Sequence, residues 1–135
     1  MRKIFIDTSG WLAIVVKSDS LYLKASEIYF DRYAQGFEFV THDGVLLEVG
    51  NSLSSVRGRQ LAVRLVETIK TSARISLLHV SEELYEAGWR LYAARPDKEW
   101  GAVDCISFAL MEREGILEAL TADKHFEQAG FTKLL

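Results

Sequence analysis

The sequence contains only one cysteine and one proline among its 135 residues. A single cysteine excludes an internal disulfide, and no cysteines and histidines have the spacing of a structural zinc site. We therefore expect a reducing, cytoplasmic setting. Nothing in the sequence indicates a linker: it has no stretch rich in glycine and serine, no internal repeat, and no proline other than Pro96. Residues 1–135 are therefore predicted to form a single domain.

Long apolar runs are also absent. The run from Trp11 to Val16 is far shorter than the roughly 20 residues that a membrane-spanning helix needs. The basic and then apolar start, Met1 to Ile6, resembles the start of a signal peptide, but Asp7 interrupts it and no small-residue cleavage site follows cleanly. We expect neither a membrane span nor secretion.

Positive charge is not in excess, because 16 Lys and Arg face 19 Asp and Glu, for a net charge of −3. The field of the whole molecule would repel RNA, so RNA binding would need a local basic patch or bound cations. Such a patch is a candidate role for Arg57, Arg59 and Arg64, near Lys70 and Arg74. A solvated helix face explains the same cluster equally well.

Apolar runs alternate along the chain with segments of helical periodicity, and 49% of the residues are hydrophobic, as in an ordinary globular protein. Helices are predicted from about Gly10, capped by Thr8 or Ser9, and after a cap at Thr41 or Asp43. Alternation of this kind predicts a three-layer α/β/α sandwich with a mainly parallel central sheet. The predicted strands are 3–6, 37–40, 75–80, 117–121 and 131–134, and the other helices are about 20–33, 58–72, 82–95, 102–114 and a short one from 123.

Two aspartates follow predicted strands directly. Asp7 ends the first strand, and Asp123 lies just beyond the strand at 117–121. Because ligands bind outside the carboxyl ends of parallel strands, both are predicted at the binding edge of the sheet. Each could instead only cap the next helix, which is the commoner role for either residue taken alone.

Glu48 lies on the helix that follows the second strand. At about 100° per residue, it falls on the polar side of that helix, which follows the same sheet edge as Asp7. A solvated glutamate is the ordinary alternative. The predicted apolar face is Val45, Leu46, Leu47, Val49, Gly50, Leu53 and Val56, and the polar face is Glu48, Asn51, Ser52 and Ser55.

Asp104 stands at the start of a helix that is apolar on nearly all sides. The helix dipole and the free amides of the first turn would stabilise this carboxylate by about 0.3–1 kcal/mol. A cation shared with other carboxylates would stabilise it further. The apolar residues around it are Cys105, Ile106, Phe108, Ala109, Leu110 and Met111.

If these four carboxylates converge, their repulsion should raise their pKa values unless a cation offsets it. Oxygen ligands without histidine or cysteine favour Mg²⁺ or Mn²⁺ over zinc. A cation held in this way can activate water and bridge a phosphate, so the pattern predicts metal-dependent phosphodiester hydrolysis.

Other residues that often carry chemistry have ordinary explanations. Trp11, Trp89 and Trp100 could stack on bases, but burial in the core or in a dimer surface is the commoner role. Cys105 is expected to be a small buried hydrophobe. The histidines lack metal-pair spacing, although His125, two residues after Asp123, could support a ligand.

Taken together, four motifs resemble the PIN-domain ribonucleases, and among them the small toxins of the VapC type, over essentially the whole chain. They are Asp7-Thr8-Ser9-Gly10-Trp11, Glu48-Val49-Gly50-Asn51, Trp100 through Asp104-Cys105-Ile106-Ser107-Phe108, and Thr121-Ala122-Asp123-Lys124-His125-Phe126 before Gly130-Phe131.

The resemblance implies an α/β/α fold, an endoribonuclease that depends on Mg²⁺ or Mn²⁺, a cognate antitoxin protein that blocks the acidic site, and commonly a homodimer. One position departs from the pattern, because Val103 stands where similar proteins commonly have Thr or Ser, which could lower activity. The implied catalytic and metal-binding residues are Asp7, Glu48, Asp104 and Asp123, and the implied supporting polar residues are Thr8, Ser9, Asn51 and Thr121.

Three alternatives remain at this point. The first is a housekeeping PIN nuclease in RNA processing, and the second is an inactive PIN-like scaffold that binds protein. The third is a phosphoacceptor signalling domain, which needs paired acids after the first strand, whereas Asp7 is followed by Thr8 and Ser9.

Overall fold

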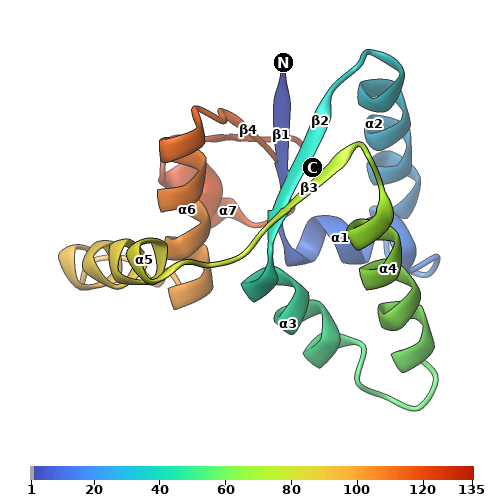
Figure 1. Ribbon diagram of the computed structural model, residues 1–135, viewed down its shortest axis with the longest axis horizontal. Coiled ribbons are helices and arrows are strands. Elements are labelled where there is room, and N and C mark those ends of the chain that lie inside the picture. Colours follow the sequence, from blue (N-terminus) through green and yellow to red (C-terminus); the bar gives the residue numbers. More distant parts are fainter. Residues whose placement is uncertain (1) are drawn as a thin grey trace.

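A sheet of five parallel strands forms the centre of the computed structural model, which describes residues 2–135 (Figure 1). The strand order is β3-β2-β1-β4-β5, and every neighbouring pair is parallel, so the sheet is wholly and not only mainly parallel. The strands are β1 (Lys3–Ile6), β2 (Glu38–His42), β3 (Ile75–Leu78), β4 (Glu118–Leu120) and β5 (Thr132–Lys133).

Helices cover the sheet on both sides, with α1, α2 and α4 on one side and α5, α6 and α7 on the other (Figure 1). The predicted three-layer α/β/α sandwich is therefore confirmed. None of the helices in residues 2–135 is long and apolar enough to cross a membrane. The helices are α1 (Thr8–Val15), α2 (Tyr22–Ala34), α3 (Asp43–Ser52), α4 (Arg59–Thr71), α5 (Glu82–Ala94), α6 (Ala102–Glu114) and α7 (Lys124–Gln128).

The central strand β1 is buried and places Asp7 at the carboxyl edge of the sheet. Ile4, Phe5 and Ile6 are at most 1% exposed, as expected for a parallel strand that is covered on both faces. Asp7 follows them directly, so its carboxylate lies at the carboxyl end of a strand in the middle of the core.

At α1 and α3, neither cap is one of the residues named for it above, although the cap role weighed as the alternative for Asp7 is confirmed. Asp7, and not Thr8 or Ser9, caps α1, because its Oδ1 accepts a hydrogen bond from the Gly10 amide at 3.0 Å. Likewise His42, and not Thr41 or Asp43, caps α3: its Nδ1 accepts from the Val45 amide at 3.3 Å. The predicted caps make other hydrogen bonds. The Thr8 hydroxyl donates to Glu48, the Thr41 hydroxyl donates to the Ile6 carbonyl, and the Asp43 carboxylate accepts from the Val80 amide.

The predicted apolar face of α3 was too broad. Val45 and Val49 are fully buried, but Leu47 is 72% exposed. Val56 is 94% exposed because the helix ends at Ser52, so the wheel does not extend to it. The face of α3 that packs on the core therefore consists of the buried Val45 and Val49 and the partly buried Leu46. Helix α6, by contrast, is buried on most sides, as predicted.

Candidate active site

All four predicted acids line one cleft of about 500 Å³ at the carboxyl ends of β1 and β4. Thr8, Ser9 and Asn51 also line the cleft, whereas Thr121 is buried beside it under Asp7. The predicted RNA-binding residues Arg57, Arg59 and Arg64 are not among the lining residues. The cleft is lined by Asp7, Thr8, Ser9, Leu12, Glu48, Asn51, Ser52, Asp104, Asp123 and His125.

Asp7 is the most deeply placed of the four carboxylates, at 7% exposure. Its Oδ1 accepts from the Ser9 hydroxyl at 2.9 Å and from the Gly10 amide at 3.0 Å, and its Oδ2 accepts from the Thr121 hydroxyl at 2.9 Å. Burial raises the pKa of Asp7 to about 6 in spite of these bonds, and the nearby charge of Asp123 adds to the effect. The side chain is thus held rigidly in a place where its negative charge is poorly compensated.

Ser9 and Thr121 join the two strand ends that carry Asp7 and Asp123. The Ser9 hydroxyl accepts from the Ala122 amide at 3.0 Å, and the Thr121 hydroxyl accepts from the Asp123 amide at 2.9 Å. Because the same two hydroxyls contact Asp7, they fix the start of α1 against the turn that follows β4. A catalytic or metal-supporting role for them remains a prediction.

Glu48 reaches the cleft from α3 and is half-buried. The Thr8 hydroxyl donates to its Oε1 at 2.5 Å, a short distance typical of a bond to an ionised carboxylate. Burial is the main cause that raises the pKa of Glu48, and the charges of Asp104 and Asp123 raise it further. Thr8 therefore orients the glutamate into the cleft.

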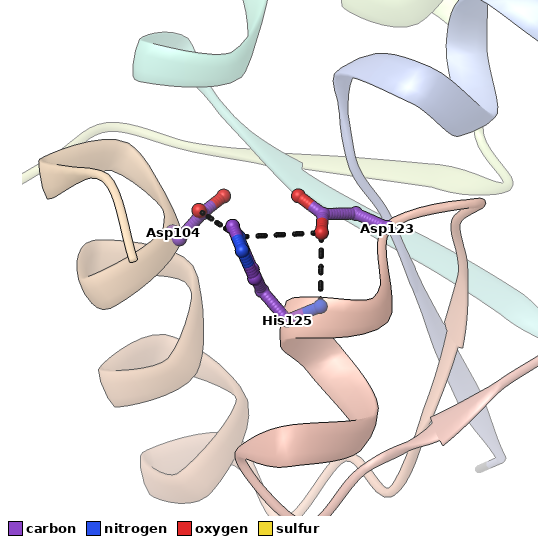
Figure 2. Close-up of side chains that lie close together, drawn as sticks. All are labelled: Asp104, Asp123 and His125. Carbon is purple, nitrogen blue, oxygen red and sulfur yellow. Dashed lines mark hydrogen bonds and ion pairs between the residues drawn. The ribbon is translucent and has the colours of Figure 1, made fainter. Parts of the chain in front are cut away.

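The remaining two acids meet around His125, as Figure 2 shows. The His125 Nδ1 lies 3.3 Å from Asp104 Oδ2 and 3.3 Å from Asp123 Oδ1. One ligand atom from each of the three side chains falls within a group whose members are at most 4.8 Å apart. Burial is again the largest cause that raises the pKa of Asp104, followed among the raising effects by the charge of Asp123.

Asp104 and Asp123 can each cap a helix and bind a ligand at the same time, although from sequence alone these roles are alternatives. Asp104 Oδ2 accepts from the Gly101 amide at 3.1 Å, and Asp123 Oδ1 accepts from the His125 amide at 2.9 Å. Within residues 2–135, the second oxygen of each, and Oε2 of Glu48, have no hydrogen-bond partner. These oxygens remain available to a ligand.

The arrangement fits a divalent cation. Four carboxylates share one cleft, and three of them have raised pKa values. A bound cation would offset both the cost of burying these negative charges and the repulsion between them. The predicted rise in pKa is therefore confirmed for Asp7, Glu48 and Asp104, but burial contributes more to it than mutual repulsion does. A donor set dominated by carboxylate oxygen fits Mg²⁺ or Mn²⁺.

His42 connects two helices that carry site acids and could not be found from sequence spacing. It is fully buried, and its Nε2 lies 2.9 Å from the Ser107 hydroxyl of α6. Because Nδ1 accepts from the Val45 amide, Nε2 carries the hydrogen and donates it to Ser107. His42 thereby joins the start of α3, which bears Glu48, to the helix that bears Asp104.

Substitution of His42 by glutamine should remove a specific acid sensitivity of the fold. Burial lowers the pKa of His42 from 6.5 to about 4, so the unfolded chain binds a proton between these values that the folded chain excludes. Stability should therefore fall as the pH drops from about 6.5 to 4, by about 3 kcal/mol in total from this residue. Urea unfolding in EDTA at several pH values measures the effect.

The expected result is that wild type is more stable than His42→Gln at pH 7 and that this difference shrinks toward pH 4. The control is Lys24→Gln, at an exposed position of α2, which should follow the wild-type profile. A difference between wild type and His42→Gln that is the same at pH 7 and pH 4 would show that His42 does not titrate as its burial requires.

Known proteins share this fold and length. The sequence model of the PIN domain matches residues 4–132. The 23S rRNA-specific endonuclease VapC20 of Mycobacterium tuberculosis, from strains CDC 1551 / Oshkosh and H37Rv, is 30% identical over 131 residues, which cover 97% of this chain and 97% of that protein. The crystal structure of M. tuberculosis VapC20, described as a sarcin-ricin loop cleaving toxin, has a TM-score of 0.86 and 29% identity, and the match covers 96% of each chain.

These similarities cover both the sheet and the acidic cleft, and they agree with the resemblance carried by the four sequence motifs. A family match over nearly the whole chain, together with a relative of equal length, leaves one assignment: this chain belongs to the PIN domain family.

Proposed function

We propose that this chain, as a single domain over residues 1–135, is a Mg²⁺- or Mn²⁺-dependent endoribonuclease and the toxin of a toxin–antitoxin pair. The observation that carries the proposal is the cleft in which Asp7, Glu48, Asp104 and Asp123 converge. Within residues 2–135, each of the last three acids keeps one carboxylate oxygen without a hydrogen-bond partner. Similarity over 97% of the chain to an endonuclease named for 23S rRNA supports RNA as the substrate class.

The four acids would hold the metal. When bound, the metal would supply Lewis-acid activation of the phosphodiester and of the attacking water. Thr8 would keep Glu48 turned into the cleft through their hydrogen bond, and Ser9 and Thr121 would hold the buried Asp7 in place.

The polar wall formed by Asn51, one turn after Glu48, would face the RNA backbone. We also propose Arg57, Arg59 and Arg64 as RNA contacts. Arg57 and Arg59 follow the end of α3, whose last residues Asn51 and Ser52 line the cleft. Arg64 has weaker support, since it lines a separate, apolar groove between α1, α2 and α4.

The proposed partners are a cognate antitoxin protein, which would cover the acidic cleft, and a second copy of this chain. Helix α5 exposes three aromatic side chains on one face, Tyr85, Trp89 and Tyr92, with neighbouring ring centroids 6.2 and 5.2 Å apart. Exposed aromatic faces of this kind are typical of protein interfaces and support the homodimer. The proposed setting is the cytoplasm.

A cleavage assay with Asp104→Asn tests the nuclease proposal directly. Wild type should cut 23S rRNA with Mg²⁺ or Mn²⁺, and EDTA should abolish cleavage. Asp104→Asn should reduce the rate on the order of 10³-fold, because a metal ligand contributes several kcal/mol to the transition state. The matched control is Asp97→Asn, in an exposed loop, which should cleave like wild type.

No cleavage by wild type with either metal would favour the inactive scaffold, and equal cleavage by Asp104→Asn would show that the site is assigned wrongly. A housekeeping nuclease would cleave RNA in the same way, so the two functions are distinguished by expressing the protein in cells. A toxin should arrest growth, and co-expression of a small protein encoded beside it should relieve the arrest.

A further inference from the structure

His125 is the one nitrogen donor among the side chains that line the acidic cleft, apart from the amide of Asn51. Its ring points between Asp104 and Asp123 (Figure 2). It reaches this place because Asp123 caps α7 by accepting from the His125 amide at 2.9 Å, so the histidine starts the first turn beside the carboxylate. Its spacing from Asp123 indicated only that it could support a ligand, because its second contact, Asp104, lies 21 residues away on another helix.

The contact distances of His125 are informative. Its Nδ1 is 3.3 Å from one oxygen of Asp104 and 3.3 Å from one oxygen of Asp123. A charge-assisted N–H···O bond is normally about 2.7–2.9 Å long, so neither contact is a well-formed ion pair. Neighbouring ligand atoms around an octahedral cation with bonds of about 2.1 Å are about 3 Å apart. The spacing of the His125 nitrogen from each carboxylate oxygen therefore allows the three side chains to share one cation.

We infer that His125 supplies a nitrogen ligand, through Nδ1, to the metal site between Asp104 and Asp123. The inference rests on the proposed function, because it concerns the same metal. It adds that the site has mixed oxygen and nitrogen donors and so binds Mn²⁺ in preference to Mg²⁺. Mg²⁺ takes oxygen ligands and water, and an imidazole adds affinity mainly for transition-metal ions.

The first experiment is electron paramagnetic resonance of Mn²⁺ bound to the full chain, grown once with natural histidine and once with ¹⁵N-labelled histidine. A nitrogen that is bound directly to Mn²⁺ gives a nuclear coupling that changes with the isotope. We expect this change in wild type and in His79→Asn, and its loss in His125→Asn. The measurement on wild type stands even if a variant folds poorly.

The second experiment measures Mn²⁺ and Mg²⁺ affinity by calorimetry. His125→Asn should weaken Mn²⁺ binding by about tenfold or more while Mg²⁺ binding changes little, given that loss of groups around a metal typically costs about 10–100-fold. His79→Asn is the matched control, because His79 is an exposed histidine beside a carboxylate, 3.0 Å from Asp43 and outside the cleft.

The outcomes separate the inference from the proposed function. If Mn²⁺ binds, Asp104→Asn weakens that binding and RNA is cut, but no histidine nitrogen is coupled, then the metal site holds and His125 is only a neighbour. Equal losses of Mn²⁺ and Mg²⁺ affinity in His125→Asn would also overturn the inference. Absence of Mn²⁺ binding in wild type would overturn both.

Discussion

Replacement of Asp7 by asparagine is expected to reduce RNA cleavage on the order of 10³-fold, through loss of a charged metal ligand at the deepest point of the cleft. The metal-free variant should nevertheless fold. The asparagine side-chain carbonyl can still accept from Ser9 and from the Gly10 amide, and its amide can donate to Thr121 in place of the present bond.

The same substitution should leave stability in EDTA unchanged or improve it. Burial raises the pKa of Asp7 to about 6, which means that keeping an ionised carboxylate here opposes folding at pH 7. Asparagine removes that charge. Wild-type protein therefore retains at Asp7 a group that opposes folding, as expected where a residue serves a ligand and not the core.

Cleavage rates with Mn²⁺ and urea unfolding in EDTA measure the two effects on the same samples. Asp31→Asn, at an exposed position of α2, is the control and should leave both unchanged. If Asp7→Asn loses several kcal/mol of stability together with cleavage, Asp7 is mainly a structural cap of α1, and its assignment to the metal site fails.

Much of the fold could be predicted because the sequence alternates short apolar runs with helical periods. The order of strands and helices followed from that alternation, and helix α6 was predicted correctly because its apolar residues surround the helix. The residues named as caps of α1 and α3 were wrong, although the cap role weighed for Asp7 was correct. At both strand ends several polar side chains stand side by side, and contacts with distant residues, such as Thr8 with Glu48, decide which one caps.

The candidate site divides in the same way. Chain direction alone placed Asp7 and Asp123 at one sheet edge, and the helical wheel placed Glu48 on a polar side, although it wrongly buried Leu47. The contribution of His42 depends on Ser107, which is 65 residues away, so no local pattern could reveal it. RNA and the toxin role came from the family resemblance and not from spacing.

Substitution of Gly10 by alanine is expected to destabilise the fold by about 3 kcal/mol or more. At Gly10, helix α1 passes very close to the end of β4. A Cβ atom there would lie 2.0 Å from the Leu120 carbonyl oxygen and 3.0 Å from a methyl group of Ile6. Because the first contact is with backbone, no side-chain rotation can relieve it, and α1 must move away from the sheet.

Urea unfolding in EDTA measures this cost, and Gly50→Ala is the matched control. Gly50 also lies within a helix, but a Cβ atom added there would meet no neighbouring group within 4 Å, so alanine should add about 0.5–1 kcal/mol of stability. A loss below 1 kcal/mol for Gly10→Ala would contradict so close an approach.

The close approach of α1 to β4 also matters for the site, because Thr121, directly after Leu120, must stay within hydrogen-bond distance of Asp7. Moving α1 from β4 should therefore weaken Mn²⁺ binding in whatever fraction of Gly10→Ala remains folded.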